Sequence, residues 1–137
     1  MIDHERALQK ALLVWLKADP ALQALLGDPA RVWDAPPDPT DCPHLRLGDS
    51  GSRPVAADGC GFEHRLTLHC VSDFRGTEEA RAVAAAVRVR LQGAVLEADG
   101  IRTVDLTTSQ IDVTRSPDLG RTYAAVRVRA VTEAEAD

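Results

Sequence analysis

Two segments of the chain alternate strictly between inward and outward residues, and this pattern constrains the fold more than any other feature. Residues 62–71 read FEHRLTLHCV and residues 122–131 read TYAAVRVRAV. Because successive side chains of a strand point to opposite faces, each segment is predicted to be a strand with one face in the core and one polar face. A sheet with a single apolar face needs a covering layer on that side only.

The side chains of these two strands are predicted to divide between the faces. The residues predicted to face the core are Phe62, Leu66, Leu68, Cys70, Ala124, Val126, Val128 and Ala130. The residues predicted to face away from it are Glu63, Arg65, Thr67, His69, Tyr123, Arg127 and Arg129. His64 has the inward parity, and we interpret it as a hydrogen-bonded histidine of the core or its edge.

Two helices are predicted at the start of the chain. The first covers residues 3–18, has apolar residues at helical spacing and begins at Asp3 as its N-cap. The second, residues 20–26, begins with a proline, a residue suited to the first helical position, behind Asp19 as its cap. Gly27 can end it in a left-handed conformation.

A third helix is predicted from Thr77, its cap, to Gly93. Two glutamates follow the cap, and their negative charges are stabilised by the positive end of the helix dipole. Its predicted buried stripe is Ala80, Val83, Ala84, Val87 and Leu91.

The remaining strands are shorter or less regular. Residues 31–36 and 44–48 are predicted to be short strands, with a proline-rich irregular segment between them. Residues 48–61 are rich in Gly, Ser and Pro and are predicted to be a loop.

A long strand is predicted over residues 101–115. Val104 and Leu106 share one parity, whereas Ile111 and Val113 have the other. A β-bulge between Leu106 and Ile111 would explain the change of phase.

These elements predict an α+β fold. We expect one mixed, mostly antiparallel sheet of four to five strands, with two main helices packed on one face. The expected order is helix, short helix, three strands, helix, two strands. The chain is expected to form a single domain over residues 1–137, with frayed ends at 1–2 and 133–137 and a long hairpin loop at 50–61.

Composition narrows the classes of function. The net charge of −5 argues against binding nucleic acid or an anionic membrane over the whole surface. The acidic and basic residues at the start do not suit a secretory signal, and no apolar run is long enough to cross a bilayer. Three cysteines without a Cys-x-x-Cys pair predict free thiols in a reducing cytoplasm.

The letters GDSG at residues 48–51 match the surroundings of the nucleophilic serine in trypsin-like proteases. A serine nucleophile needs a base and a group that orients it. Only His4 and His44 precede Ser50, and neither has the flanking residues of that family. We interpret the motif as a polar turn and predict no enzymatic activity.

No cofactor or metal site is predicted. His64 and His69 lie five residues apart on one strand and point to opposite faces, so they cannot share a metal ion. No glycine-rich loop with a lysine opens a helix, and the segment EADGIRTVD has the wrong spacing for a calcium loop.

The outward face of the sheet carries the strongest candidate for a binding surface. Arg127 and Arg129, with Arg65 and Tyr123, could form a basic stripe there. Three interpretations stay open for it: a solvated face, a protein interface and a contact with nucleic acid. Arginine and tyrosine are favoured at protein interfaces.

The order of these elements resembles the tail-completion or tail-terminator family of long-tailed phages and gene transfer agents. The resemblance is carried by the run RVWDAPP through PHLRLGD, by LTLHCVSDFRG leading straight into a helix, and by the closing TYAAVRVRAVTE. It covers nearly the whole chain. The family has no catalytic motif to transfer.

The resemblance implies a subunit of a homo-oligomeric ring, a hexamer in the usual case. Such a ring caps the head-proximal end of the tail tube, stops its growth and joins the tail to the head connector or stopper. DNA passes through the pore without sequence-specific binding. The implied location is the neck of a virion or gene transfer agent particle assembled in the bacterial cytoplasm, without a membrane partner.

If the resemblance holds for the ring, six residues are candidates for the subunit interface: Arg53, Val55, Arg65, Tyr123, Arg127 and Arg129. Two of them lie in the predicted loop and four on the outward sheet face. Other classes stay open, namely a different neck or head–tail joining protein, a small cytoplasmic binding domain and a small enzyme.

Overall fold

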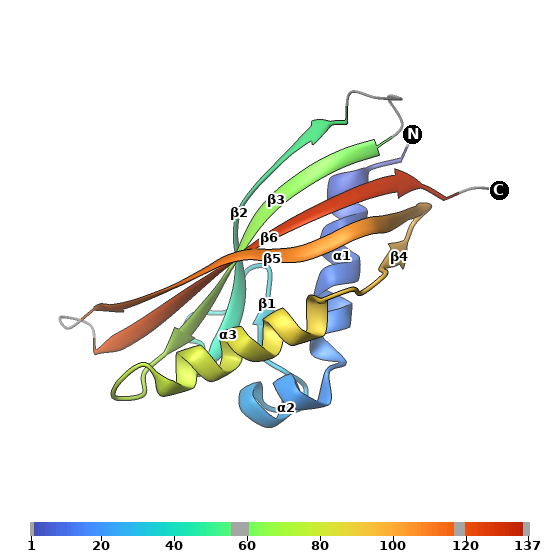
Figure 1. Ribbon diagram of the computed structural model, residues 1–137. Helices are drawn as coiled ribbons and strands as arrows, with labels where there is room; N and C mark the ends of the chain where they lie inside the picture. The colour runs from blue at the N-terminus through green and yellow to red at the C-terminus, as the bar shows by residue number, and fades with distance from the viewer. Residues whose placement is uncertain (1, 56–60, 117–119, 136–137) are drawn as a thin grey trace.

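The computed structural model describes residues 2–55, 61–116 and 120–135. In this part of the chain a curved six-stranded sheet carries three helices on one side (Figure 1). The strands are β1 Val32–Trp33, β2 His44–Pro54, β3 Gly61–Ser72, β4 Glu97–Ala98, β5 Ile101–Ser116 and β6 Arg121–Ala134. Their order across the sheet is β1-β2-β3-β6-β5-β4. Only β1 and β2 pair in parallel, so the predicted mixed, mostly antiparallel sheet is confirmed.

The helices begin where the sequence predicts. They are α1 His4–Lys17, α2 Pro20–Leu26 and α3 Glu78–Leu91. The carboxylate of Asp3 accepts the N–H of Arg6 at 3.0 Å, and Asp19 caps α2 in the same way. Gly27 follows α2 with a φ of +91°, a conformation that costs glycine little. Thr77 precedes α3, although its side chain makes no capping bond.

The core lies between the helices and the inner sheet face. It joins the predicted stripe of α3 to the inward residues of β3 and β6, and Leu68, Val83 and Val126 are fully buried within it. Phe62 faces the helices, as predicted, and packs its ring on His4 with 4.6 Å between ring centroids, although it is only half-buried. None of the helices described is both long and apolar enough to cross a membrane.

The sheet has more strands than the four to five predicted. The additional strand, β4, pairs with the start of β5 through the two-residue turn Asp99–Gly100. Both residues have positive φ, +47° and +90°, as an Asp-Gly hairpin requires. The predicted elements include no hairpin here, although an Asp-Gly pair is a strong local signal for one.

The loop predicted over residues 48–61, and the hairpin loop predicted over 50–61, are wrong over most of their length. Strand β2 continues to Pro54 and pairs with β3, after a register shift between Leu47 and Ser50. Beyond Arg46 the other side of β2 has no partner strand among the described residues, so Pro54, which lacks a backbone N–H, lies in an edge segment where proline is tolerated. Residues 56–60 lie outside the described part.

Strand β5 contains the predicted bulge and a second one. Register shifts fall between Thr108 and Gln110, as expected, and also between Thr103 and Asp105. The second shift turns Val104 outward to 51% exposure while Leu106 is buried, so the shared parity predicted for these two residues is wrong. At the C-terminus, β6 stays paired with β5 through Ala134, so the fraying predicted from residue 133 is wrong there; residues 136–137 are outside the described part.

Candidate assembly interface

The sheet face opposite the helices presents four of the six candidate interface residues together. Arg53 on β2, Arg65 on β3, and Arg127 and Arg129 on β6 all project there. The three helices pack on the other side, so this face stays open in the described part of the chain (Figure 1).

A single carboxylate, that of Glu63, organises three of these arginines. Its Oε1 accepts from Nε of Arg53 at 3.1 Å and from Nε of Arg65 at 3.4 Å. Its Oε2 accepts from Nη2 of Arg129 at 2.7 Å and from Nε of Arg129 at 3.0 Å. The guanidinium groups cover Glu63 so well that its side chain is only 9% exposed.

The strand register explains why an acid is needed at this point. Arg65 lies directly opposite Arg129 across the β3–β6 ladder, and like charges in that position repel. Glu63 lies two residues before Arg65 on the same face of β3 and bonds to both arginines. The hydrogen bond from Arg129 and the neighbouring guanidinium charges hold the pKa of Glu63 below its usual range.

Two more acids complete the network, so the arginines do not form a free basic stripe. Asp105 accepts from Arg129 Nη1 at 2.6 Å, and Asp112 lies 3.6 Å from Nε of Arg127. Four arginines therefore meet three carboxylates. These acids are not among the predicted interface residues, although the outward parity of Glu63 beside Arg65 indicates an ion pair on this face.

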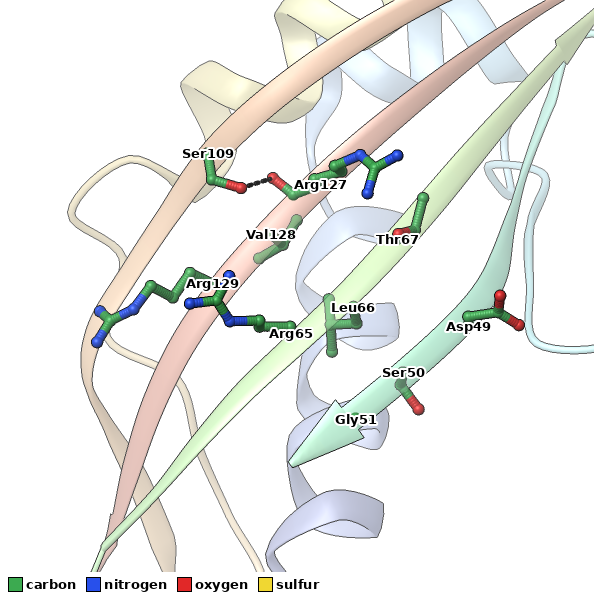
Figure 2. A pocket seen from close by; sticks show the side chains of 10 residues that line it. All are labelled: Asp49, Ser50, Gly51, Arg65, Leu66, Thr67, Ser109, Arg127, Val128 and Arg129. Carbon is green, nitrogen blue, oxygen red and sulfur yellow. Dashed lines mark hydrogen bonds between the residues drawn. The ribbon is translucent and has the colours of Figure 1, made fainter. Parts of the chain in front are cut away.

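An open hollow of about 240 Å³ lies beside this network (Figure 2). Arg65, Arg127 and Arg129 line it from β3 and β6, and residues 49–51 line it from β2. Arg65 and Arg127 remain mostly exposed, at 74% and 58%, despite their ion pairs. They are therefore available to a partner.

Ser50 borders this hollow but lacks the partners of a nucleophile. It is a residue of strand β2, and no hydrogen bond joins it to a histidine within the described ranges. His69, on the neighbouring strand, lies against Gly48, where an added Cβ would come within 2.5 Å of its Nε2. The GDSG letters thus mark a bulged strand rather than the predicted turn.

We expect Ser50→Ala to leave particle assembly and stability unchanged, because the hydroxyl has no base to activate it. The check is labelling with a fluorophosphonate probe at neutral pH, alongside thermal unfolding of both proteins. Covalent labelling of wild-type Ser50 that the alanine variant loses would contradict the prediction.

The other two candidate residues lie apart from the arginine network. Tyr123, six residues before Arg129 on β6 and so roughly 20 Å away, lines a separate hollow with the proline-rich segment 36–40. Val55 follows β2 and is half-buried, and its N–H donates to the carbonyl oxygen of Gly61 at 2.9 Å.

Within the described residues, no three His, Cys, Asp or Glu side chains gather as a metal site. Cys42 and Cys70 are free thiols, and burial raises the pKa of Cys70 to about 12, which makes it unreactive. Cys60 lies outside the described part.

Known proteins that resemble this chain include a family of tail completion proteins and a chain of a gene transfer agent particle. Residues 10–133 match the family described as "Tail completion protein gp17". A chain of the solved "Virion of native gene transfer agent (GTA) particle" is 30% identical, with a TM-score of 0.86 over 97% of this chain and 99% of that one. Another solved chain, 18% identical over 97% of this chain and 94% of its own, has a TM-score of 0.49 and supports no argument. Curated protein sequences gave no match.

Proposed function

Because the chain belongs to the tail completion protein family, we propose that it forms a ring, a hexamer in our proposal, at the head-proximal end of a phage-like tail. The ring caps the tail tube, terminates its growth and joins the tail to the head connector. It acts as a structural protein of a virion or gene transfer agent particle and not as an enzyme.

The observation that carries this proposal is the extent of the likeness to the virion chain. Both chains are covered almost completely, 97% and 99%, so the likeness extends over the whole subunit and not over one shared motif. A protein with the same complete fold and 30% identity is a component of a gene transfer agent particle.

The geometry suits a subunit that associates through its sheet. Strand β1 covers β2 only at Leu45 and Arg46, and β4 covers β5 only at Ile101 and Arg102. In the described part the rest of both edges has no partner strand, and such edges readily pair with another chain. The exposed arginines beside Glu63 add polar, directional contacts of the kind found at interfaces.

The charge balance suits DNA passage without tight binding. The chain carries a net charge of −5, and the arginines of the open face are largely offset by Glu63, Asp105 and Asp112. Each of the four arginines on this face meets a carboxylate, so the face has little net positive charge to neutralise phosphates, and DNA in a pore lined by it would not be held fast.

The test is electron microscopy and mass photometry of the purified protein, combined with deletion of its gene in a particle-producing strain. We expect rings with an open pore, and we expect the deletion to yield unjoined heads and tails of abnormal length. Tails of normal length that fail to join would instead indicate a different neck component. A protein that stays monomeric at all concentrations, with normal particles from the deletion strain, would refute the proposal.

A further inference from the structure

An apolar groove of about 470 Å³ opens between α1 and the segment that leads from α3 into β4. Trp15 lies in it, with Val14 and Val95 beside it. These two valines are 62% and 61% exposed, which places them among the most exposed large apolar side chains of the described residues. Exposed apolar residues gathered around a groove mark a contact with another molecule.

The groove is preformed because Trp15 is fixed on both sides. The guanidinium carbon of Arg90 lies 3.7 Å from the centroid of the Trp15 ring. The Trp15 indole Nε1 donates to the carbonyl oxygen of Arg90, and Arg90 Nε donates to the carbonyl oxygen of Trp15, both at 3.0 Å. A rigid groove loses little conformational entropy when it is filled.

An exposed aromatic side chain lies at the other end of α3. The chain has only two phenylalanines, and Phe74, in the turn between β3 and α3, is 47% exposed. The turn is ordered, since Ser72 Oγ accepts the N–H of Phe74 at 3.1 Å and donates to Glu79 at 2.7 Å. Phe74 precedes the start of α3, whereas Arg90, which borders the groove, lies near its end, so the two patches are roughly 20 Å apart along this 14-residue helix.

The charges around the two patches are complementary. Phe74 stands between Asp73 and Arg75, both exposed, and the groove is bordered by Lys10 and Glu97. In the described part of the chain Asp73, Arg75 and Glu97 form no ion pair, and Lys10 meets only the exposed Asp99 at 3.5 Å. The turn at Phe74 thus carries an acid and a base on either side of an aromatic ring, and the groove carries one base and one acid on its rim.

We propose that Phe74 of one copy inserts into the Trp15 groove of the next copy, with its flanking charges facing Lys10 and Glu97. The contact joins two different patches, so it is head-to-tail, and a contact of this kind repeats around a closed ring. The inference rests on the proposed ring, because it names the partner of the groove as a second copy of this chain.

Cysteine cross-linking tests the direction of the contact. In a background with Cys42→Ser and Cys60→Ser, the double variant Phe74→Cys, Val14→Cys should form disulfide-linked ladders under mild oxidation. Each single variant should stay uncrosslinked, and a mixture of the two should stop at dimers. Self-linking of Phe74→Cys alone, or no ladder from the double variant, would overturn the proposal.

A matched pair of substitutions tests the energetics. Phe74→Ser should weaken self-association by about tenfold or more, as loss of a buried aromatic anchor does. Val89→Ser is the control, because Val89 is 68% exposed on α3 and lies outside the groove. Both variants should keep the wild-type melting temperature. Rings that persist in Phe74→Ser would overturn this contact but leave the proposed function standing, whereas a wild-type protein without rings would overturn both.

Discussion

Leu68→Ala is expected to lower the free energy of unfolding by about 2–5 kcal/mol. Leu68 lies in the middle of β3, is 0% exposed and belongs to the core shared with α3. Its ladder neighbours on the same inner face are Leu47 on β2 and Val126 on β6. Elements on several sides surround the cavity that truncation leaves, so it cannot easily collapse.

The measurement is urea unfolding of the monomer, with Leu47→Ala as the matched control. Leu47 is the same residue type, faces the same side and is only half-buried. Its substitution by alanine should therefore lower the free energy of unfolding clearly less than that of Leu68. If Leu68→Ala unfolds at the same urea concentration as the wild type, the assignment of the inner face is wrong.

The parts of the fold that sequence predicts well are those with one dominant local signal. The period of two in β3 and β6 indicates which side chains face the core. The structure confirms this for the buried residues Leu66, Leu68, Cys70, Ala124, Val126, Val128 and Ala130. The cap residues Asp3 and Asp19 fix the helix starts. In both cases the interaction involves neighbours along the chain, so no knowledge of the tertiary fold is needed.

The elements that the sequence predicted wrongly depend on partners distant in sequence. The second half of β2 has the composition of a loop, and it is a strand because β3 offers it a ladder from Arg65 to Phe62. The bulge beside Val104 depends on how β5 meets β6. A propensity for turns is a weak preference that pairing with a long regular strand can override.

The candidate site shows the same division. Parity alone placed Arg65, Arg127 and Arg129 on one face, but the offset between β3 and β6 decides that Glu63 reaches Arg129. The register between two strands is set by the tertiary fold and not by neighbours along the chain. The expected basic stripe is consequently an ion-pair network whose centre, Glu63, went unrecognised.

A second tertiary feature lies on the inner face of the sheet close to Glu63, where one hydroxyl joins two buried histidines. Thr132 Oγ1 on β6 lies 2.9 Å from Nδ1 of His4 and 2.8 Å from Nε2 of His64. All three residues are buried. A hydroxyl supplies one donor and can accept as well, so it can serve both rings when they are neutral.

Burial lowers the pKa of His64 below its usual value of 6.5. The unfolded chain therefore takes up a proton more readily than the folded one as the pH falls through that value, and stability decreases on the acid side. Above it the imidazole is neutral in both states. A comparison of variants around Thr132 should accordingly be made at about pH 8, where this proton uptake does not contribute.

Under those conditions Thr132→Val is expected to lower the free energy of unfolding by at least about 2 kcal/mol. Valine keeps the shape but leaves a ring nitrogen of His4 and one of His64 buried without a partner, each at a cost of about 1–3 kcal/mol. Thr107→Val, on the exposed outer face of β5, is the matched control and should change stability by less than about 0.5 kcal/mol. Equal urea midpoints for the two variants would mean that the histidines find other partners, and that the Thr132 hydroxyl does not hold α1 to the sheet.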